Sequence, residues 1–493
     1  MKHLIVIIGL LLCGKHSNSQ QKYWVEFRDR GETPKVKGYT LKETQEGQVY
    51  QPYLDSLQCL KIEVINTSKW LNSVSSKLTD SDIKLLQCKS FVKSVSPVHA
   101  LKSVGRLAHS PRDINYGFLF NQINSSAFKK AGLSGKNVVI GIMDTGFADA
   151  DEDQILRHVF DNDKVREAKD FVDPSNNNFY KGMNSPAERH GVYVWRMIAG
   201  KDSQHKETIG LSSDAVFYLA RTDNGGKESR IEEDNWISAL EWFHSKGVKI
   251  VNSSIAYSLD FDNSKENHNA LEMDGKTTAI TRAAQAAAEK GLIIIVAAGN
   301  DGDNKKWRVI SAPADAQNVI SVGSTDEHNL RSSYSGIGTP SLSYIKPNVS
   351  CYSVAIGTSF TAPVITGIIG AMLERDPSLD LAKIASILEA SSSLYPFPND
   401  FMGYGVPDCE RILKLIEDPN HDFKRSEIKE AEKSIVLEDD DVDAIAFHKK
   451  DKQHVIKQVV INRADGKLTI SRLSKAIYTT VILKNKVIEI HWK

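Results

Sequence analysis

The feature that most constrains the fold is an alternation of short apolar runs with amphipathic stretches between residues 116 and 416. The runs have the length and β-branched character of buried strands, and lie at 138–143, 216–220, 248–251, 292–297 and 319–322. Helical periodicity is found near 190–199, 232–246 and 277–290, and again after residue 359. This alternation predicts an α/β fold, with a doubly wound, mostly parallel sheet covered by helices on both faces.

The segments on either side of this region have different patterns. Residues 20–97 predict a small α+β unit, with strands at 23–27, 60–65 and 91–95 and a helix near 81–86. Residues 98–115 and 417–434 lack apolar periodicity and are expected to be linkers. Residues 435–493 predict a small β-domain, with strands at 456–461, 467–470, 477–483 and 487–492 and a hairpin turn at Asp465-Gly466.

The N-terminal 19 residues have the pattern of a secretory signal peptide. Lys2 precedes an apolar run at 4–12, and the small residues Ser17 and Ser19 follow it. A lipoprotein signal is disfavoured because Leu12, which precedes Cys13, is not small. No later stretch reaches the roughly 20 apolar residues of a membrane-spanning helix. We therefore expect a secreted protein with no stable membrane span.

Charge and cysteine content narrow the classes of partner. Lys plus Arg and Asp plus Glu both number 62, so no basic field favours nucleic acid or an anionic membrane surface.

Four cysteines remain after the signal segment, namely Cys59, Cys88, Cys351 and Cys409. Secretion permits disulfides, but free buried thiols are an equal alternative. None of the four has metal-ligand spacing.

The segment 357–363, Gly-Thr-Ser-Phe-Thr-Ala-Pro, places Ser359 between a glycine turn and an apolar helical pattern. Pro363 is tolerated only in the first turn of a helix, so Ser359 is expected at the helix N-terminus. Free amides and the positive end of the helix dipole favour developing negative charge there. The two alternatives for Ser359 are a catalytic nucleophile and an N-capping side chain.

Three further residues provide the groups that nucleophilic serine catalysis needs. Asp144 follows the first apolar run, His190 opens a helical stretch beside a glycine, and Asn300 follows the run at 292–297. They are candidates for the orienting carboxylate, the general base and an oxyanion donor. Taken singly, each has an ordinary alternative, as a turn residue, a satisfied surface or core histidine, and a loop amide.

Taken together, these segments resemble the signature segments of the subtilase family of serine proteases, of the secreted Bacteroidetes type. The matching segments are Asp144-Thr145-Gly146, His190-Gly191, Ala297-Ala298-Gly299-Asn300 and 357–363, in the order Asp, His, Ser of subtilisin. The resemblance implies a peptidase domain at 116–416. It also implies that the primary specificity pocket is walled by Ser254, Ile255, Ala256, Ala297, Ala298 and Gly299, which favours a hydrophobic substrate residue.

The resemblance also gives roles to the flanking segments. Residues 20–97 are similar to the inhibitory propeptides of subtilases, which implies self-cleavage within 98–115. Residues 435–493 are similar to the sorting domains of proteins exported by the type IX system, and an ordinary β accessory domain is an equal alternative. The resemblance requires no cofactor.

Two acidic stretches are candidate calcium ligands, namely Asp149, Asp151 and Asp153, and the run at 438–443. Solvated loops are the favoured interpretation of both.

The sequence differs from the family pattern at three positions. Val192 and Tyr193 follow Gly191 where Thr-His is usual, and Ala256 stands where glycine is usual. These differences give two hypotheses: a secreted, self-processed serine endopeptidase that acts on polypeptides, or a catalytically silent scaffold of the same fold.

Overall fold

The computed structural model describes residues 21–31, 48–98, 116–181, 186–204, 207–224, 231–259, 267–437, 443–464, 467–484 and 486–493. The predictions for 1–19, 99–115, 438–442 and Asp465-Gly466 lie outside these residues. The chain forms two compact units, one up to Val98 and one from His99 onward. Each unit is considered by itself.

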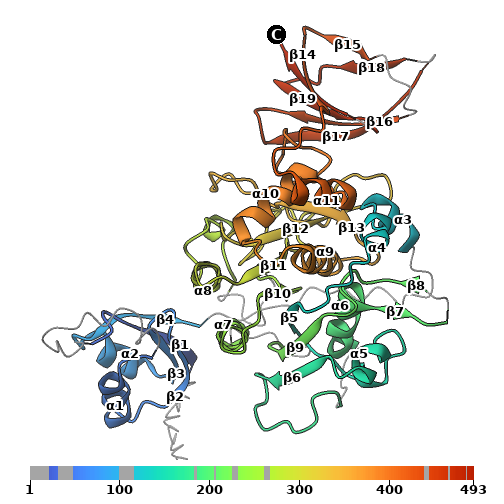
Figure 1. The fold of residues 1–493 in the computed structure, drawn as a ribbon. Helices are drawn as coiled ribbons and strands as arrows, with labels where there is room; N and C mark the ends of the chain where they lie inside the picture. Colours follow the sequence, from blue (N-terminus) through green and yellow to red (C-terminus); the bar gives the residue numbers. More distant parts are fainter. Residues whose placement is uncertain are drawn as a thin grey trace, which may run out of the picture. The chain divides into compact units, whose positions relative to one another are not determined.

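The first unit is an antiparallel sheet with two helices (Figure 1). Its strands, in the order β2-β3-β1-β4, are β1 Gln21–Phe27, β2 Val64–Ser68, β3 Ser73–Leu78 and β4 Val92–Pro97. Helix α2, Asp80–Gln87, begins where Thr79 and Asp82 form a capping box. The prediction of a strand at 60–65 was wrong in its first residues, because helix α1, Gln51–Cys59, ends at Leu60.

The second unit is built on a seven-stranded sheet in which every neighbouring pair is parallel. The strand order is β13-β12-β11-β10-β5-β9-β6. The bounds are β5 Val139–Asp144, β6 Val165–Asp170, β9 Val216–Arg221, β10 Ile250–Ser253, β11 Ile293–Ala297, β12 Ile320–Thr325 and β13 Val349–Tyr352. The predicted doubly wound α/β fold is confirmed. The edge strands β6 and β13 were not predicted.

Helices pack on the sheet in two pairs. Helix α6, His190–Ala199, packs against α9, Ala362–Arg375, and α7, Ile231–Ser245, packs against α8, Ala279–Glu289. The α6–α9 side buries a continuous apolar core that includes Trp195, Ile365 and Ile369. All four helices begin within two or three residues of the expected positions, because their apolar faces follow the 3.6-residue period.

Shorter elements complete the unit around this sheet. They are α3 Tyr116–Gln122, α4 Ser126–Lys130, α5 Arg157–Asp161, α10 Leu381–Ser391, α11 Cys409–Glu417 and the paired strands β7 Lys201–Asp202 and β8 Glu207–Thr208.

The C-terminal strands form a five-stranded sheet, β14-β20-β19-β16-β17, and a two-stranded pair, β15–β18. Their bounds are β14 Ser426–Ala431, β15 Ser434–Leu437, β16 Asp443–Lys449, β17 Val455–Asn462, β18 Leu468–Ser471, β19 Tyr478–Ile482 and β20 Val487–Trp492. The predicted small β-domain is confirmed. Residues 426–431, expected to be linker, instead form β14 beside β20, and this strand is polar because it lies at the sheet edge.

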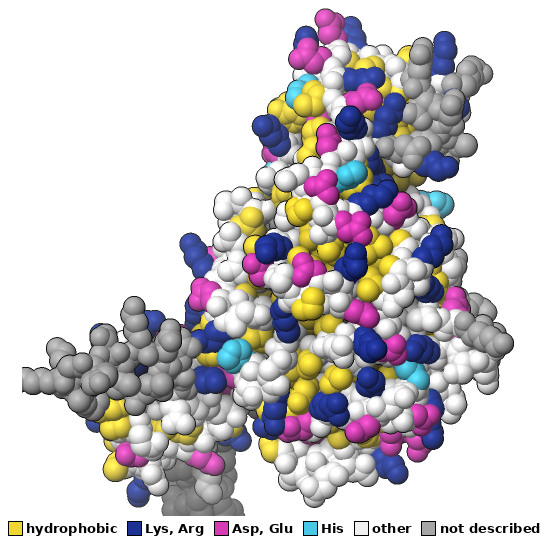
Figure 2. All heavy atoms as spheres, viewed as in Figure 1, with side chains coloured by type: hydrophobic (Ala, Val, Ile, Leu, Met, Phe, Trp, Pro, Cys, Tyr) yellow, Lys and Arg dark blue, Asp and Glu magenta, His cyan; other side chains and the backbone are white. Residues whose placement is uncertain are grey.

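The surface charge, the helices and the cysteines of the described residues bear on the predicted partners and disulfides. Basic and acidic side chains are intermixed over the face shown in Figure 2. None of the helices in the described ranges is long and apolar enough to cross a bilayer. All four described cysteines are free: Cys59 and Cys88 are exposed, and Cys351 and Cys409 are buried.

Candidate active site

Asp144 is the last residue of β5 and is fully buried. Its Oδ1 accepts hydrogen bonds from the Thr145 amide at 2.8 Å and the Thr145 hydroxyl at 3.1 Å. The same oxygen lies 2.6 Å from Nδ1 of His190. Three donors therefore converge on one carboxylate oxygen, which fixes the carboxylate at the carboxyl edge of the sheet.

The backbone brings Asp144 and His190 together through two glycines. The Gly191 amide donates to the Gly146 carbonyl at 2.9 Å. A Cβ on Gly191 would lie 2.5 Å from that carbonyl oxygen, and a Cβ on Gly146 would lie 2.5 Å from the Glu188 carbonyl oxygen. The start of α6 can approach the end of β5 this closely only because both positions lack a side chain.

The imidazole of His190 is suited to act as a base. Its Nδ1 bonds to Asp144, so the proton on Nδ1 is fixed and Nε2 is the basic atom. Nε2 is buried and has no hydrogen-bond partner among the described residues. Burial would lower the pKa of His190, but the charge of Asp144, the hydrogen bond to it and the charge of Asp223 outweigh burial and raise the pKa.

Asp223 is a second buried carboxyl group at this edge, and sequence reasoning missed it. It follows β9, the neighbour of β5, and the Thr222 amide next to it donates to the Asp144 carbonyl at 3.1 Å. Burial, together with the charge of Asp144, raises the pKa of Asp223 to about 7. The only sequence signal was its position three residues after the predicted strand at 216–220.

Ser359 lies in a 3-10 turn, Thr358–Phe360, that packs against α6. The N-cap of α9 is Thr361, so of the two alternatives for Ser359 the N-capping role is excluded, and Ser359 lies just before the helix N-terminus. This turn directly precedes α9, which begins at Ala362 and has Pro363 in its first turn. The imidazole of His190 and the ring of Phe360 lie 5.6 Å apart between centroids, which places the turn beside the base.

The hydroxyl of Ser359 donates to the backbone carbonyl of Ser254 at 2.9 Å. In return, the Ser254 hydroxyl donates to the Ser359 carbonyl at 2.8 Å. The structure therefore joins Asp144 to His190 but holds the Ser359 hydroxyl on Ser254 rather than on Nε2. Such a hydroxyl reaches a neighbouring base by rotation about χ1, and catalytic hydrogen bonds commonly tighten only when substrate is bound.

Asn300 is oriented by the same turn. Its Oδ1 accepts from the Thr358 amide at 2.8 Å and from the Thr358 hydroxyl at 3.0 Å. Because a backbone amide can only donate, the atom that faces Thr358 is the carbonyl oxygen, which fixes the position of the NH2 group. A Cβ on Gly357 would lie 3.6 Å from that Nδ2. The side chain is thus held rigidly beside the turn that carries Ser359.

A small pocket adjoins Ser359 and Asn300. Five of the six predicted wall residues line it, namely Ser254, Ile255, Ala256, Ala297 and Gly299. They follow β10 and β11, which are parallel neighbours in the sheet. The sixth, Ala298, is fully buried and does not line the pocket. Sequence reasoning missed Ser258, Asp301 and Ser311, which also line the pocket.

Two of the three candidate calcium ligands after Asp144 form ion pairs with arginines. Asp149 pairs with Arg189 at 2.7 Å, and Asp153 contacts both Arg189 and Arg196. Within the described ranges, no group of three or more His, Cys, Asp or Glu side chains is arranged to hold a metal ion.

Two residues that differ from the family pattern, Val192 and Tyr193, pack against other parts of the protein. Val192 is buried in the core, and the Tyr193 ring lies 5.1 Å from the Arg196 guanidinium.

Comparison with known proteins identifies the family. The subtilase family model matches residues 135–405, which is more than half of the chain. The chain belongs to the subtilase family. A second model, the Bacteroidota peptidase S8 propeptide domain, matches residues 39–112. The protein is accordingly a subtilisin-like serine endopeptidase with a propeptide domain.

Individual relatives agree with this assignment. Subtilisin DY of Bacillus licheniformis is 26% identical over 282 residues, covering 55% of this chain and 89% of that protein. Subtilisin NAT of Bacillus subtilis subsp. natto is 25% identical over 338 residues, covering 66% of this chain and 76% of that protein.

Two solved structures share the fold. An epidermin leader peptide processing serine protease from Staphylococcus aureus has a TM-score of 0.57 at 17% identity, covering 80% of this chain and all of that chain. Fervidolysin from Fervidobacterium pennivorans, a keratinolytic enzyme, has a TM-score of 0.56 at 14% identity, covering 94% of this chain and 71% of that chain.

Proposed function

We propose that this subtilase hydrolyses peptide bonds through an acyl-enzyme on Ser359, with His190 as base and then acid, Asp144 as its orienter and Asn300 as oxyanion donor. The observation that carries the proposal is the 2.6 Å contact between Asp144 and His190, which leaves Nε2 as the basic atom. With His190 held in this tautomer, the Ser359 hydroxyl has only to rotate away from the Ser254 carbonyl and toward Nε2 for the proton transfer to begin.

The first half of the reaction forms the acyl-enzyme. Nε2 of His190 takes the proton of Ser359 as Oγ attacks the substrate carbonyl, and Asp144 stabilises the imidazolium that results. The carbonyl oxygen, now negative, is stabilised by the Asn300 NH2 group and the Ser359 amide. His190 then gives its proton to the leaving amine.

In the second half, His190 takes a proton from water as the water attacks the acyl-enzyme. It returns that proton to Ser359 when the product acid leaves. No step requires a metal or another cofactor.

We further propose that the chain is a secreted zymogen that processes itself. The propeptide match at 39–112 supports an N-terminal inhibitor domain, and the signal-like segment at 1–19 supports export to the extracellular space or the cell surface. On this proposal, the boundaries are a signal peptide at 1–19, a propeptide at 20–97, a processing region at 98–115, a peptidase domain at 116–416 and a β-domain at 435–493. The linker predicted at 417–434 is shorter than expected, because residues 426–431 form β14 of the C-terminal sheet.

The decisive experiment compares the full-length protein with its Ser359→Ala variant. We expect the variant to lose about a millionfold in kcat, as for removal of the nucleophile in subtilisin, and to accumulate as an uncut precursor. A fluorophosphonate should form an adduct on Ser359 of the parent protein, located by peptide mass spectrometry. Normal release of residues 20–97 from the variant would contradict self-processing, and an adduct on another serine would contradict the assigned nucleophile.

A further inference from the structure

The pocket beside Ser359 is small. It has a free volume of about 10 Å³, close to the space of one water molecule. An acyl carbon on Ser359, with its oxygen toward Asn300, would place the adjacent substrate side chain in this pocket, because both residues line it. This side chain belongs to P1, the residue on the acyl side of the cleaved bond. The inference thus rests on the proposed function.

Ser311 fills the space at one wall of the pocket. Its amide donates to the Ala298 carbonyl at 3.0 Å, which holds it against the 297–299 wall. A Cβ placed on Gly299 would lie 2.4 Å from the Ser311 hydroxyl and 3.0 Å from its Cβ. The serine side chain therefore already contacts the glycine backbone, and it is almost completely buried. A larger substrate group could enter only by displacing Ser311.

Another part of the pocket is polar. Ser258 donates a hydrogen bond to Oδ2 of Asp301, and both side chains line the cavity. Asp301 is only 9% exposed, so further burial by an apolar substrate group would remove water from a carboxylate. That desolvation is costly. The lining therefore opposes large apolar side chains by charge as well as by size.

The two walls are joined by backbone hydrogen bonds that resist widening. The Tyr257 amide donates to the Ala312 carbonyl at 2.8 Å, and the Ala312 amide donates to the Tyr257 carbonyl at 3.0 Å. Ser258 and Ser311 are the residues next to this pair in each segment. Separating the walls would break both hydrogen bonds in a buried setting.

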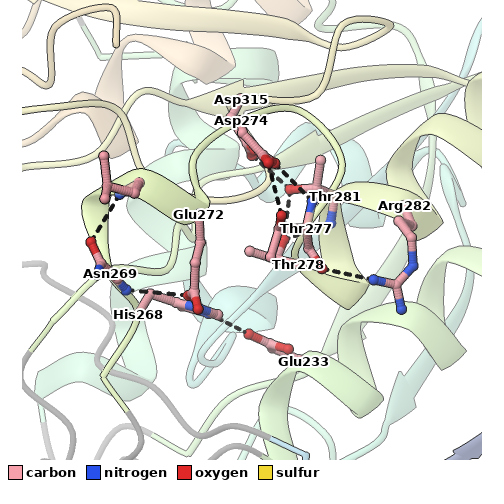
Figure 3. A network of polar contacts seen from close by, with 11 residues as sticks. Glu233, His268, Asn269, Glu272, Asp274, Thr277, Thr278, Thr281, Arg282 and Asp315 are labelled. Carbon is pink, nitrogen blue, oxygen red and sulfur yellow. Dashed lines mark hydrogen bonds and ion pairs between the residues drawn. The ribbon is translucent and has the colours of Figure 1, made fainter. Parts of the chain in front are cut away.

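Two side-chain networks are connected to these segments, and Figure 3 shows their residues. On one side, the His268 amide donates to the Ser258 carbonyl at 3.1 Å, and its ring lies 2.9 Å from Glu233 and 3.0 Å from Glu272. On the other side, Asp315 accepts from the Thr281 hydroxyl at 2.6 Å, close after Ala312. The walls are thus built into the protein rather than free to open.

We propose that this enzyme cleaves after small residues, glycine, alanine or serine, and that Ser311 is the specificity-determining residue that excludes larger side chains. This replaces the sequence-based expectation of a hydrophobic substrate residue. A lysine would complement the charge of Asp301, but its long side chain has no space to enter.

The first test is a P1 series on the processed, secreted enzyme. Six tetrapeptide nitroanilides that differ only in P1 (Gly, Ala, Ser, Leu, Phe and Lys) are compared by kcat/KM. We expect the best small residue to exceed each large one by about tenfold or more, since a single methylene in a tight pocket is worth about 10–200-fold. Higher kcat/KM for Leu, Phe or Lys than for Ala overturns the proposal.

The second test replaces Ser311 and measures the ratio of kcat/KM for the Phe substrate to that for the Ala substrate. Ser311→Gly should raise the Phe-to-Ala ratio of kcat/KM by about tenfold or more, because it removes the side chain that fills the space. Ser311→Ala keeps Cβ and is the matched control, with a smaller change. An unchanged ratio in Ser311→Gly overturns the role of Ser311.

Active-site titration with a fluorophosphonate separates this proposal from the catalytic one. An adduct on Ser359 together with a preference for Phe overturns only the pocket inference. No adduct and no cleavage of any of the six substrates overturns both proposals.

Discussion

The charges around His190 decide the pH at which the site can work. On the proposed mechanism, His190 must be neutral to accept the Ser359 proton. Burial would lower the pKa of His190, but the charges of Asp144 and Asp223 raise it above the ordinary value. The acid limb of kcat/KM reports this pKa in the free enzyme. We therefore expect activity to rise with pH through a midpoint above about 6.5, the ordinary histidine value, and to be greatest at neutral to alkaline pH.

Asp223→Asn tests the electrostatic part of this argument. Since the Asp223 charge raises the pKa of His190, its removal should move the acid limb of kcat/KM to lower pH. The measurement is a pH profile of kcat/KM for parent and variant. A role limited to packing would leave the midpoint unmoved, because asparagine has nearly the same shape and can still accept from Thr222.

The same variant has a predicted effect on stability. The pKa of Asp223 is about 7 in the folded state, above the ordinary value of 3.8. The folded protein therefore binds a proton more tightly than the unfolded chain, so the free energy of unfolding falls as pH rises between these values. Each pKa unit is worth about 1.4 kcal/mol, so Asp223→Asn should stabilise the protein at pH 8 by up to a few kcal/mol. Equal denaturation curves at pH 8 would contradict this expectation.

At the scale of elements, the site depends on how closely α6 approaches the end of β5. Gly191 and Gly146 meet backbone to backbone, and the contact of Asp144 with His190 follows from that approach. The parallel order of β10, β5 and β9 brings their carboxyl ends to one edge. Position in the sheet therefore sets which side chains meet, and the glycines set the distance between them.

Gly191→Ala should separate these elements. Its Cβ would lie 2.5 Å from the Gly146 carbonyl oxygen, so the start of α6 must move away from Asp144. A displacement of about 1 Å can cost about a hundredfold in rate, and we expect at least that loss in kcat/KM.

Gly367→Ala in α9 is the matched control, because its Cβ would meet its nearest neighbour at an ordinary 3.4 Å. Activity of Gly191→Ala within threefold of this control would contradict the argument.

At the scale of the whole second unit, the C-terminal sheet is joined to the peptidase region. Phe447 of β16 is buried in the same apolar core as the parallel sheet. Gln458 of β17 accepts from the Arg331 amide at 3.0 Å and donates to the Arg331 carbonyl at 3.0 Å. The Val455 amide donates to Asp400 at 2.9 Å. These contacts predict that the C-terminal strands stabilise the peptidase region.

Gln458→Ala should reveal this coupling. It removes two hydrogen bonds and leaves backbone groups of Arg331 without that partner, which should cost about 1–3 kcal/mol in the free energy of unfolding. Chemical denaturation followed by tryptophan fluorescence measures the change. Gln154→Ala, at an exposed position, should change the free energy by less than about 0.5 kcal/mol. Equal values for the two variants would contradict the coupling.

The sequence predicted the elements whose burial is encoded locally. The strands β5, β9, β10, β11 and β12 each overlap one of the apolar runs in the sequence, so their existence and approximate positions are visible in the chain. Of the strands that it missed, β6, β13 and β14 are at sheet edges, whereas β3 and β16 lie in the interior of their sheets. Edge strands are short or polar because one side has no neighbour, and their apolar pattern is correspondingly weak.

By itself, the sequence determined the four candidate catalytic residues, because each stands at the end of a periodic element and belongs to a recognisable local segment. Only the tertiary structure decided that the charge of Asp223 raises the pKa of His190, that Ser311 and Asp301 line the pocket, and that the Ser359 hydroxyl donates to Ser254. The physical reason is the distance along the chain over which each effect acts. Periodicity and turn chemistry act over a few residues, whereas pocket volume and shared burial of charge depend on side chains brought together by packing.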